Sequence, residues 1–279
     1  AWRRGGAVAG LAAAALLCLD PNFTAHAPLV TNDVSFALAM LATVHVVFLA
    51  GEQLTWRRLL AICTVCGAAV STKYSAVLLG PIVFLMLCAR AVDARPWNVL
   101  GRTLETRGRR LAAVVGVCAV AAVVAWVIVW GVYRFRYAAA ADGGPINWEL
   151  LIKHTRGNEL YAQDPATAGT EQAIRGWKPS TLVRVVLFCR DHRLMPEAFL
   201  YGIMHVHMGA LVRPSFLMGQ IRDTGWWYYF PLAMLFKTPL STLAAWLGAL
   251  VVGGITLPRW IGDFRSRWLA TCIAIPVAV

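Results

Sequence analysis

The sequence predicts an all-α protein that is a polytopic bundle of transmembrane helices with a broken helical hairpin and a long extracytoplasmic loop. Its 279 residues are 59% hydrophobic and only 14% charged, which is far more apolar than an ordinary soluble domain. Several runs approach the roughly 20 apolar residues that cross a bilayer, and residues 111–133 form the clearest of them. The net charge of +12 gathers in short clusters beside these runs, as in cytoplasmic loops, so no nucleic-acid partner is expected.

The first two helices bracket a polar loop. The basic cluster at residues 2–4 is expected to be cytoplasmic, so the run that follows leads outward and ends at Asp20-Pro21. The loop at residues 19–33, LDPNFTAHAPLVTND, is then extracytoplasmic, and residues 34–50 return toward Arg57-Arg58. Because the chain starts without a methionine and stops inside an apolar run, we expect a fragment that lacks helices at both ends.

The broken hairpin is predicted at residues 59–89, a stretch longer than one span and shorter than two. Both of its flanks are rich in arginine, so the chain must turn back at STKYS, residues 71–75. Two half-helices of about 14 residues reach only ~21 Å, short of a ~30 Å hydrocarbon core. Lys73 is therefore expected in the outer part of the membrane. The alternative is one long tilted helix with a snorkelling Lys73.

The rest of the chain divides into a loop and a second membrane part. We expect domains at residues 1–133, 134–225 and 226–279, with the middle one an extracytoplasmic loop. Within that loop, Pro196-Glu197 opens a helical pattern that predicts an amphipathic helix at the membrane interface. Its shared face carries Phe199, Leu200, Ile203, Met204 and His207. An aromatic belt at Trp226 to Phe230 precedes a span toward Arg259-Trp260, and Trp268 begins a truncated last span.

Ionisable side chains near the membrane are candidate functional residues because they are costly there. Asp33 opens a helix and could be a helix cap, a role that Asn32 or Thr31 would fill equally well. Asp20 ends a helix, where the helix dipole disfavours a carboxylate, although Asp-Pro turns are common. His26 lies between the two aspartates and could join a metal or proton-transfer site.

The basic candidates suit a lipid-phosphate ligand. Lys73 and nearby arginines could hold a phosphate whose lipid tail stays in the bilayer, with neutral donors from Tyr74, Ser71 and Ser75. Lys237 would lie about 16 Å deeper than Trp226 if the chain between them were one helix. A helix lying on the surface would instead leave Lys237 near the headgroups. An extracytoplasmic carboxylate could deprotonate an acceptor hydroxyl.

Three stretches carry a family resemblance: LDPNFTAHAPLVTNDVSFALAM, STKYSAVLLGP and RPSFLMGQIRDTGWWYYFPLAMLFKTPL. They resemble the integral-membrane GT-C glycosyltransferases of the protein O-mannosyltransferase-like superfamily, glycosyltransferase family 39 and its bacterial relatives, over about residues 1–257. The resemblance implies glycosyl transfer from a polyprenyl- or dolichyl-phosphate sugar to a hydroxyl on a protein, glycan or lipid acceptor. It also implies a multi-pass protein of the plasma membrane with its active site on the extracytoplasmic side.

The resemblance also assigns roles. Asp33 matches the functional aspartate that the family carries in such a loop, and Asp20 matches it less closely. We expect Lys73, Tyr74, Arg222 and Lys237 around the donor phosphate. The family's principal catalytic acid lies on an earlier loop, which this chain is expected to lack. No nucleotide site is needed and no cofactor is assigned, while a divalent metal, with His26 as a candidate ligand, stays open.

A transporter of a small anionic or lipid-linked substrate is the alternative function. Broken helices and membrane lysines occur in transporters as well. Transporters more often show internal repeats and short outer loops, whereas this sequence has no evident repeat and a long region at residues 134–225. The glycosyltransferase is therefore the favoured interpretation.

Overall fold

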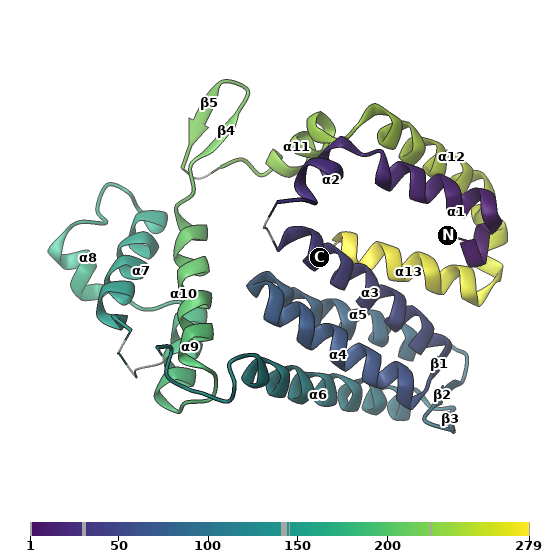
Figure 1. Ribbon diagram of the computed structural model, residues 1–279, viewed down its shortest axis with the longest axis horizontal. Coiled ribbons are helices and arrows are strands. Elements are labelled where there is room, and N and C mark those ends of the chain that lie inside the picture. The colour runs from purple at the N-terminus through teal and green to yellow at the C-terminus, as the bar shows by residue number, and fades with distance from the viewer. Residues whose placement is uncertain (1, 30–31, 141–143, 145, 224, 279) are drawn as a thin grey trace. The chain divides into compact units, whose positions relative to one another are not determined.

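A computed structural model describes residues 2–29, 32–140, 144, 146–223 and 225–278, with the side chains of residues 2–5 and 256–262 outside the description. The chain forms two compact units, residues 1–124 with 230–279 and residues 125–229 (Figure 1). The described residues are mostly helical, which confirms the predicted all-α membrane bundle. Among them, three helical segments are long and apolar enough to cross a membrane: Asp33–Glu52, Tyr74–Val92 and Arg107–Val132.

The first unit begins with the two helices around the polar loop. Its N-terminal helices are α1 (Trp2–Cys18), α2 (Pro21–His26) and α3 (Asp33–Glu52). The next part is α4 (Trp56–Thr72), the short 3₁₀ helix η1 (Tyr74–Leu78), α5 (Leu79–Val92) and α6 (Arg107–Val132). The end of α6, from residue 125, already belongs to the second unit. The first unit ends with α11 (Tyr229–Lys237), α12 (Leu240–Gly262) and α13 (Phe264–Ala278), of which α11 starts at the boundary between the units.

A small sheet closes one end of this unit and shows that α4 and α5 form a hairpin. Its strands are β1 (Gln53–Leu54), β2 (Trp97–Val99) and β3 (Arg102–Leu104). β1 pairs in parallel with β2, and β2 pairs antiparallel with β3. Because β1 immediately precedes α4 and β2 follows α5, both legs return to the same end, and the helix breaks between them at Lys73.

The hairpin legs are longer than the sequence suggested. The first, α4, has 17 residues and the second, Tyr74–Val92, has 19. At 1.5 Å per residue they reach about 26 and 28 Å, so the predicted legs of ~21 Å were wrong. The first leg begins at Trp56 because Thr55 caps it, its hydroxyl accepting from the Arg58 amide at 3.3 Å. Legs of this length nearly match a ~30 Å hydrocarbon core, so the helix lengths no longer argue for a lysine deep in the membrane.

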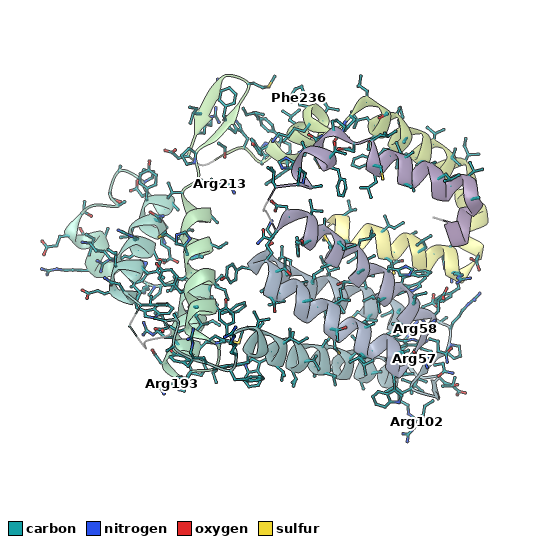
Figure 2. All side chains as sticks on the ribbon, viewed as in Figure 1. Arg57, Arg58, Arg102, Arg193, Arg213 and Phe236 are labelled. Atoms are coloured by element: carbon teal, nitrogen blue, oxygen red, sulfur yellow. The ribbon has the colours of Figure 1, made fainter. Side chains whose placement is uncertain are left out.

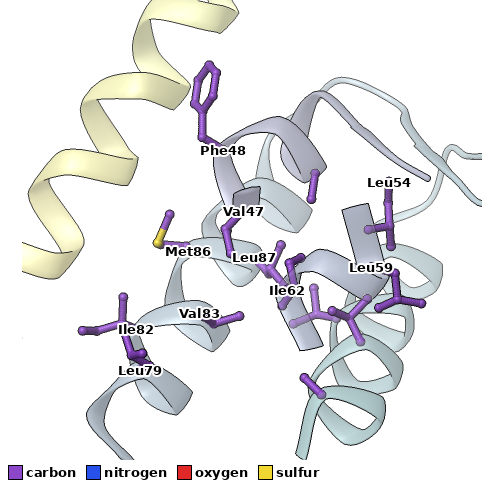
Figure 3. Close-up of a cluster of buried hydrophobic side chains, with 14 of the residues drawn as sticks. Val47, Phe48, Leu54, Leu59, Ile62, Leu79, Ile82, Val83, Met86 and Leu87 are labelled. Atoms are coloured by element: carbon purple, nitrogen blue, oxygen red, sulfur yellow. The ribbon is translucent and has the colours of Figure 1, made fainter. Parts of the chain in front are cut away.

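The core of the first unit fixes α3 against the hairpin. Its interior is a cluster of aliphatic side chains from α3, α4 and α5 (Figure 3). The largest contributors include Val47, Ile62, Leu79, Ile82, Met86 and Leu87. α13 packs on the same cluster through Trp268, whose indole donates to the Phe48 carbonyl at 2.8 Å. This packing holds the start of α3 beside the hairpin apex.

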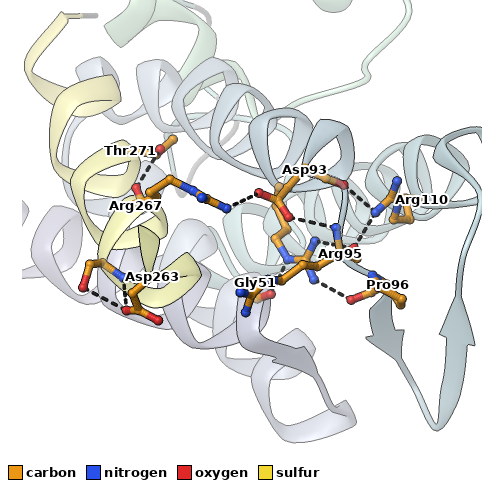
Figure 4. A network of polar contacts seen from close by, with 10 residues as sticks. Gly51, Asp93, Arg95, Pro96, Arg110, Asp263, Arg267 and Thr271 are labelled. Carbon is orange, nitrogen blue, oxygen red and sulfur yellow. Dashed lines mark hydrogen bonds and ion pairs between the residues drawn. The ribbon is translucent and has the colours of Figure 1, made fainter. Parts of the chain in front are cut away.

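Basic residues gather at the sheet end of the first unit. Figure 2 shows Arg57, Arg58 and Arg102 at this end, opposite the apex of the hairpin. The buried Arg90 links the segments at this end, because it donates to the carbonyls of Gly51 at 2.6 Å, Pro96 at 2.9 Å and Arg95 at 3.2 Å. Figure 4 labels the three residues that supply these carbonyls. The distribution agrees with a cytoplasmic location for this end under the positive-inside rule.

Arg90→Met should destabilise the protein strongly. The change removes the guanidinium from the carbonyls of Gly51 and Pro96, whereas the Arg95 carbonyl keeps Arg110 as a donor. Leaving buried partners unsatisfied costs about 3–5 kcal/mol in total. Thermal unfolding in nanodiscs measures the effect. Arg102→Met, at an exposed position on β3, is the matched control and should change stability by less than about 0.5 kcal/mol. Equal melting temperatures for the two variants would refute the bracing role of Arg90.

The second unit is a helical domain with a β-hairpin. Its elements after α6 are α7 (Trp148–Gln163), α8 (Glu171–Gly176), α9 (Thr181–Asp191), α10 (Glu197–Leu211), β4 (Ser215–Leu217) and β5 (Gln220–Arg222). The face of α10 that the sequence assigned to the membrane interface lies instead in the protein core. Phe199, Leu200 and Met204 are buried, and the last two pack with Leu151 of α7 and Val183 of α9. Periodicity identified the buried face, and protein rather than lipid covers it.

The segment after residue 225 is broken. The helix α11 begins at Tyr229, not Trp226, and α12 continues at an angle of 113°. The single helix from Trp226 to Lys237 that placed Lys237 about 16 Å deeper is therefore wrong, because α11 starts three residues later. The chain then bends at Pro239, between α11 and α12. Together α11 and residues 240–255 make a fourth candidate span only as a bent pair. The cytoplasmic location predicted for Trp2-Arg3-Arg4 and for Arg259-Trp260 concerns residues whose side chains lie outside the description.

The topology can be tested by cysteine labelling in a Cys18→Ser background, because Cys18 is exposed. Cysteines at Pro28 and at the exposed Gln163 should react with a membrane-impermeant reagent added outside. A cysteine at Arg102 should react only after the membrane is permeabilised. Labelling of positions 28 and 163 from opposite sides would contradict the predicted arrangement.

Candidate functional site

An ion pair joins the two strongest site candidates. Asp33 is the first residue of α3, and its Oδ1 pairs with Nζ of Lys73 at the apex of the hairpin. Lys73 has extended backbone angles, φ −149° and ψ 133°, which turn its side chain out of the α4 ladder. A second link lies beside it, where Asn32 Nδ2 donates to the Thr72 carbonyl at 2.8 Å. The polar loop and the hairpin apex therefore form one site.

The pair is accessible rather than buried. The side chain of Asp33 is 62% exposed and that of Lys73 is 33% exposed. Lys73 Nζ also lies 5.7 Å from the centre of the Phe36 ring, where a cation is attracted. Exposed ion pairs contribute only about 0–1 kcal/mol. An anionic ligand that offers Lys73 a better partner can therefore displace the carboxylate at little cost.

The interpretation of Asp33 as a helix cap is not supported. The capping position belongs to Asn32, whose side chain makes no capping bond and instead reaches the hairpin. Thr31, the other cap candidate, lies outside the described residues. The Asp33 carboxylate lies in the first turn of α3, where the helix dipole favours negative charge. Its described contact is the ion pair with Lys73.

Asp20 has a structural role that the sequence interpretation missed. Its Oδ1 accepts from the amides of Asn22 at 2.9 Å and Phe23 at 3.0 Å, which makes it the N-cap of α2. Pro21 occupies the first position of that helix, as is common after a cap. The expectation that Asp20 only ends a helix was therefore wrong, because a second short helix starts there. This cap accounts for an aspartate at position 20 without catalysis.

A cavity of about 750 Å³ opens beside the pair. Its walls come from α1, α2, α3 and α12, and most of the lining is apolar, including Leu16, Leu17, Val34 and Trp246. Asp20, His26 and Asp33 are the ionisable residues in its lining. The cavity thus brings together three of the predicted site residues. Its volume and mixed lining are typical of small-molecule sites.

Other predicted residues have different settings. Tyr74 is half-buried and follows Lys73 directly, whereas the Ser71 hydroxyl donates to the Gly67 carbonyl at 2.9 Å within α4. The Lys237 carbonyl accepts from Asn22 Nδ2, which joins the end of α11 to the polar loop. Arg222 belongs to the second unit, where its guanidinium lies 5.2 Å from the Trp226 ring. Arg222 is therefore not among the residues that line the cavity.

A metal site has no support in the described part of the chain. No group of three or more His, Cys, Asp or Glu side chains there is arranged to hold a metal ion. His26 is the last residue of α2 and lines the cavity. This position is compatible with the proton-transfer role that the sequence suggested.

The second unit contains a polar network that the sequence interpretation missed. The buried Glu159 of α7 accepts from the Trp177 indole at 2.8 Å and contacts His207 Nε2 at 3.1 Å. The Ser180 amide donates to the same carboxylate at 3.4 Å. Burial raises the pKa of Glu159, but the hydrogen bonds from Ser180, His207 and Trp177 outweigh it, so the pKa is lowered from its ordinary 4.5. His207 belongs to the helical face that the sequence indicated, but Glu159, Trp177 and Ser180 follow no motif.

Glu159 should make the protein acid-sensitive. A carboxyl group with a lowered folded-state pKa stabilises the protein above its ordinary value of 4.5, and this stability is lost as the pH falls toward the folded-state pKa. Melting temperatures measured from neutral pH to below 4.5 should fall less steeply in Glu159→Gln than in the unsubstituted protein. Parallel curves for the two proteins would show that Glu159 does not contribute.

The fold and the site define a helical integral-membrane protein with an acidic-basic pair at one end of its first unit. The family model described as dolichyl-phosphate-mannose-protein mannosyltransferase matches residues 2–126. This match confirms the resemblance to that family of membrane glycosyltransferases for the part of the chain that runs from α1 into α6 and contains Asp33 and Lys73. No curated protein and no solved structure gave a significant match.

Proposed function

We propose that this protein transfers a glycosyl unit from a polyprenyl- or dolichyl-phosphate donor to an acceptor hydroxyl on the extracytoplasmic side of the membrane. The observation that carries the proposal is the ion pair between Asp33 and Lys73 beside the cavity, within the stretch that matches the mannosyltransferase family. The pair lies at the end of the first unit opposite the arginine-rich sheet. That arrangement puts the site on the outer side if the arginines are cytoplasmic.

The cavity suits an amphiphilic donor. The apolar side chains of α1, α3 and α12 provide a surface for an isoprenoid chain, and the ionisable residues lie where a sugar phosphate would need polar contacts. A donor that keeps its tail in the bilayer needs no nucleotide-binding loop. The lining is therefore consistent with a lipid-linked sugar.

Lys73 is the proposed phosphate-binding residue. The ammonium of Lys73 pairs with Asp33. The phosphodiester of the donor is also an anion, so it can share or take over the ammonium, and charge-assisted contacts to phosphate are among the stronger hydrogen bonds. Donor binding then frees the Asp33 carboxylate from its partner. The same exchange couples the presence of the donor to the availability of a base.

Asp33 and Lys73 have separate roles in the proposed transfer. The bond between the anomeric carbon and the phosphate oxygen breaks, and a bond from that carbon to the acceptor oxygen forms. The hydroxyl proton passes to the Asp33 carboxylate, and the polyprenyl phosphate leaves with its negative charge beside Lys73.

Lipid retention tests the anion site without requiring turnover. The full-length protein in nanodiscs is mixed with undecaprenyl phosphate or with undecaprenol, and bound lipid is measured by native mass spectrometry. The proposal predicts retention of the phosphate lipid and weak retention of the alcohol, because only the phosphate can bind Lys73. Equal retention of both lipids would show that the cavity recognises the chain alone.

A further inference from the structure

We propose that α9 lies on the membrane surface, with its exposed apolar face in the lipid interface and Arg184 and Arg193 against anionic lipid headgroups. This surface is separate from the cavity and does not depend on the proposed transfer reaction. It also assigns membrane contact to a different helix from the one that the sequence indicated.

The exposed face of α9 has helical spacing. Leu182, Val185 and Phe188 follow one another at intervals of three residues and are 40, 54 and 55% exposed. The neighbouring face carries Val183 and Val186, which are buried in the core of the second unit. One face of α9 thus packs in the protein core, and the adjacent apolar face is exposed. An exposed apolar face of this kind marks a surface that contacts another protein or the membrane.

The end of α9 is attached to a membrane-crossing helix. The indoles of Trp126 and Trp130, in the last two turns of α6, donate to the Leu194 carbonyl at 2.7 and 3.2 Å. Tryptophans near the end of a span typically lie at the membrane interface. Leu194, three residues beyond the end of α9, is itself 41% exposed. The exposed face of α9 therefore begins at interfacial depth.

Charge complementarity favours lipid over protein as the cover. Arg184 and Arg193 are exposed and flank the apolar face, and Lys178 is exposed just before the helix. The one acidic residue in the helix, Asp191, already pairs with Arg190 at 2.8 Å. Apolar residues flanked by exposed basic ones are typical of helices that lie on anionic membranes.

Photo-crosslinking in nanodiscs of phosphatidylcholine with a minor share of phosphatidylglycerol tests the proposal. The photoreactive residue p-benzoyl-phenylalanine is placed at Val185 in the full-length protein. The same residue at the exposed Val123 of α6 serves as the lipid-facing reference, and at the exposed Gln172 of α8 as the control. Lipid adducts should form at positions 185 and 123 and be several-fold weaker at 172. Absence of lipid adducts at 185 alongside labelling at 123 overturns the proposal, as does a predominant protein adduct at 185.

The charge contribution is tested in the same preparation. Arg184→Gln should lower the preference of position 185 for phosphatidylglycerol over phosphatidylcholine by about fivefold, the effect of one arginine near an anionic surface. Arg213→Gln is the matched control, because Arg213 is an exposed arginine of the same unit outside α9 (Figure 2). Equal changes in the two variants would overturn the proposed role of Arg184.

Discussion

Lys73→Met should weaken binding of a polyprenyl-phosphate sugar by about 10–100-fold, which corresponds to the loss of one charge-assisted contact of about 1.5–3 kcal/mol. Methionine keeps much of the apolar stem and its packing near Phe36 but removes the ammonium. Folding should be nearly unchanged, because an exposed ion pair contributes little to stability. Donor affinity in nanodiscs is the measurement, with melting temperature as the check on folding.

Two further variants sharpen this result. Lys73→Arg should restore little affinity if the site is tight, because a planar guanidinium does not reproduce a compact ammonium. Lys153→Met makes the same chemical change at an exposed lysine of α7 and should leave affinity unaltered. Unchanged donor affinity in Lys73→Met would show that Lys73 does not bind the donor phosphate and only pairs with Asp33.

Asp33→Asn should abolish or severely reduce sugar transfer while donor binding is kept or becomes tighter. The amide cannot accept the hydroxyl proton as a base, and it no longer competes with the donor phosphate for Lys73. Loss of turnover with retained affinity is a combination that general misfolding would not produce. The measurement is initial transfer rate together with donor affinity in the same nanodisc preparation.

Asp20→Asn is the matched control in the same loop. Asparagine caps helices about as well as aspartate, so α2 should stay intact and transfer should fall by no more than a few-fold. Near-normal transfer in Asp33→Asn would exclude Asp33 from the reaction. An equal loss of sugar transfer in Asp20→Asn and Asp33→Asn would show that Asp20 also takes part in the reaction.

Several features of the site were predictable from the sequence for physical reasons. The break at Lys73 follows from an apolar stretch with arginines at both ends, since a chain that returns to its starting side must turn. The cap at Asp20 was also readable, because Asp followed by Pro is a common start of a helix. It was missed because α2 is only six residues long and has no apolar periodicity.

Other features depend on contacts that leave no pattern in the sequence. Asp33 and Lys73 are 40 residues apart, and only the packing of α3 on the hairpin brings them together. The apolar face of α10 was found by its periodicity, but periodicity does not distinguish burial in protein from burial in lipid. Glu159 and His207 belong to different helices and meet only in the folded second unit.

The most direct test of the central claim is transfer of a radiolabelled sugar by the full-length protein in proteoliposomes. We predict that the label moves from polyprenyl-phosphate sugar to a hydroxyl acceptor, that a nucleotide sugar does not replace the donor, and that Asp33→Asn abolishes the transfer. Movement of the intact donor or of a small anion across the bilayer, with no sugar transferred, would contradict the account and identify a transporter.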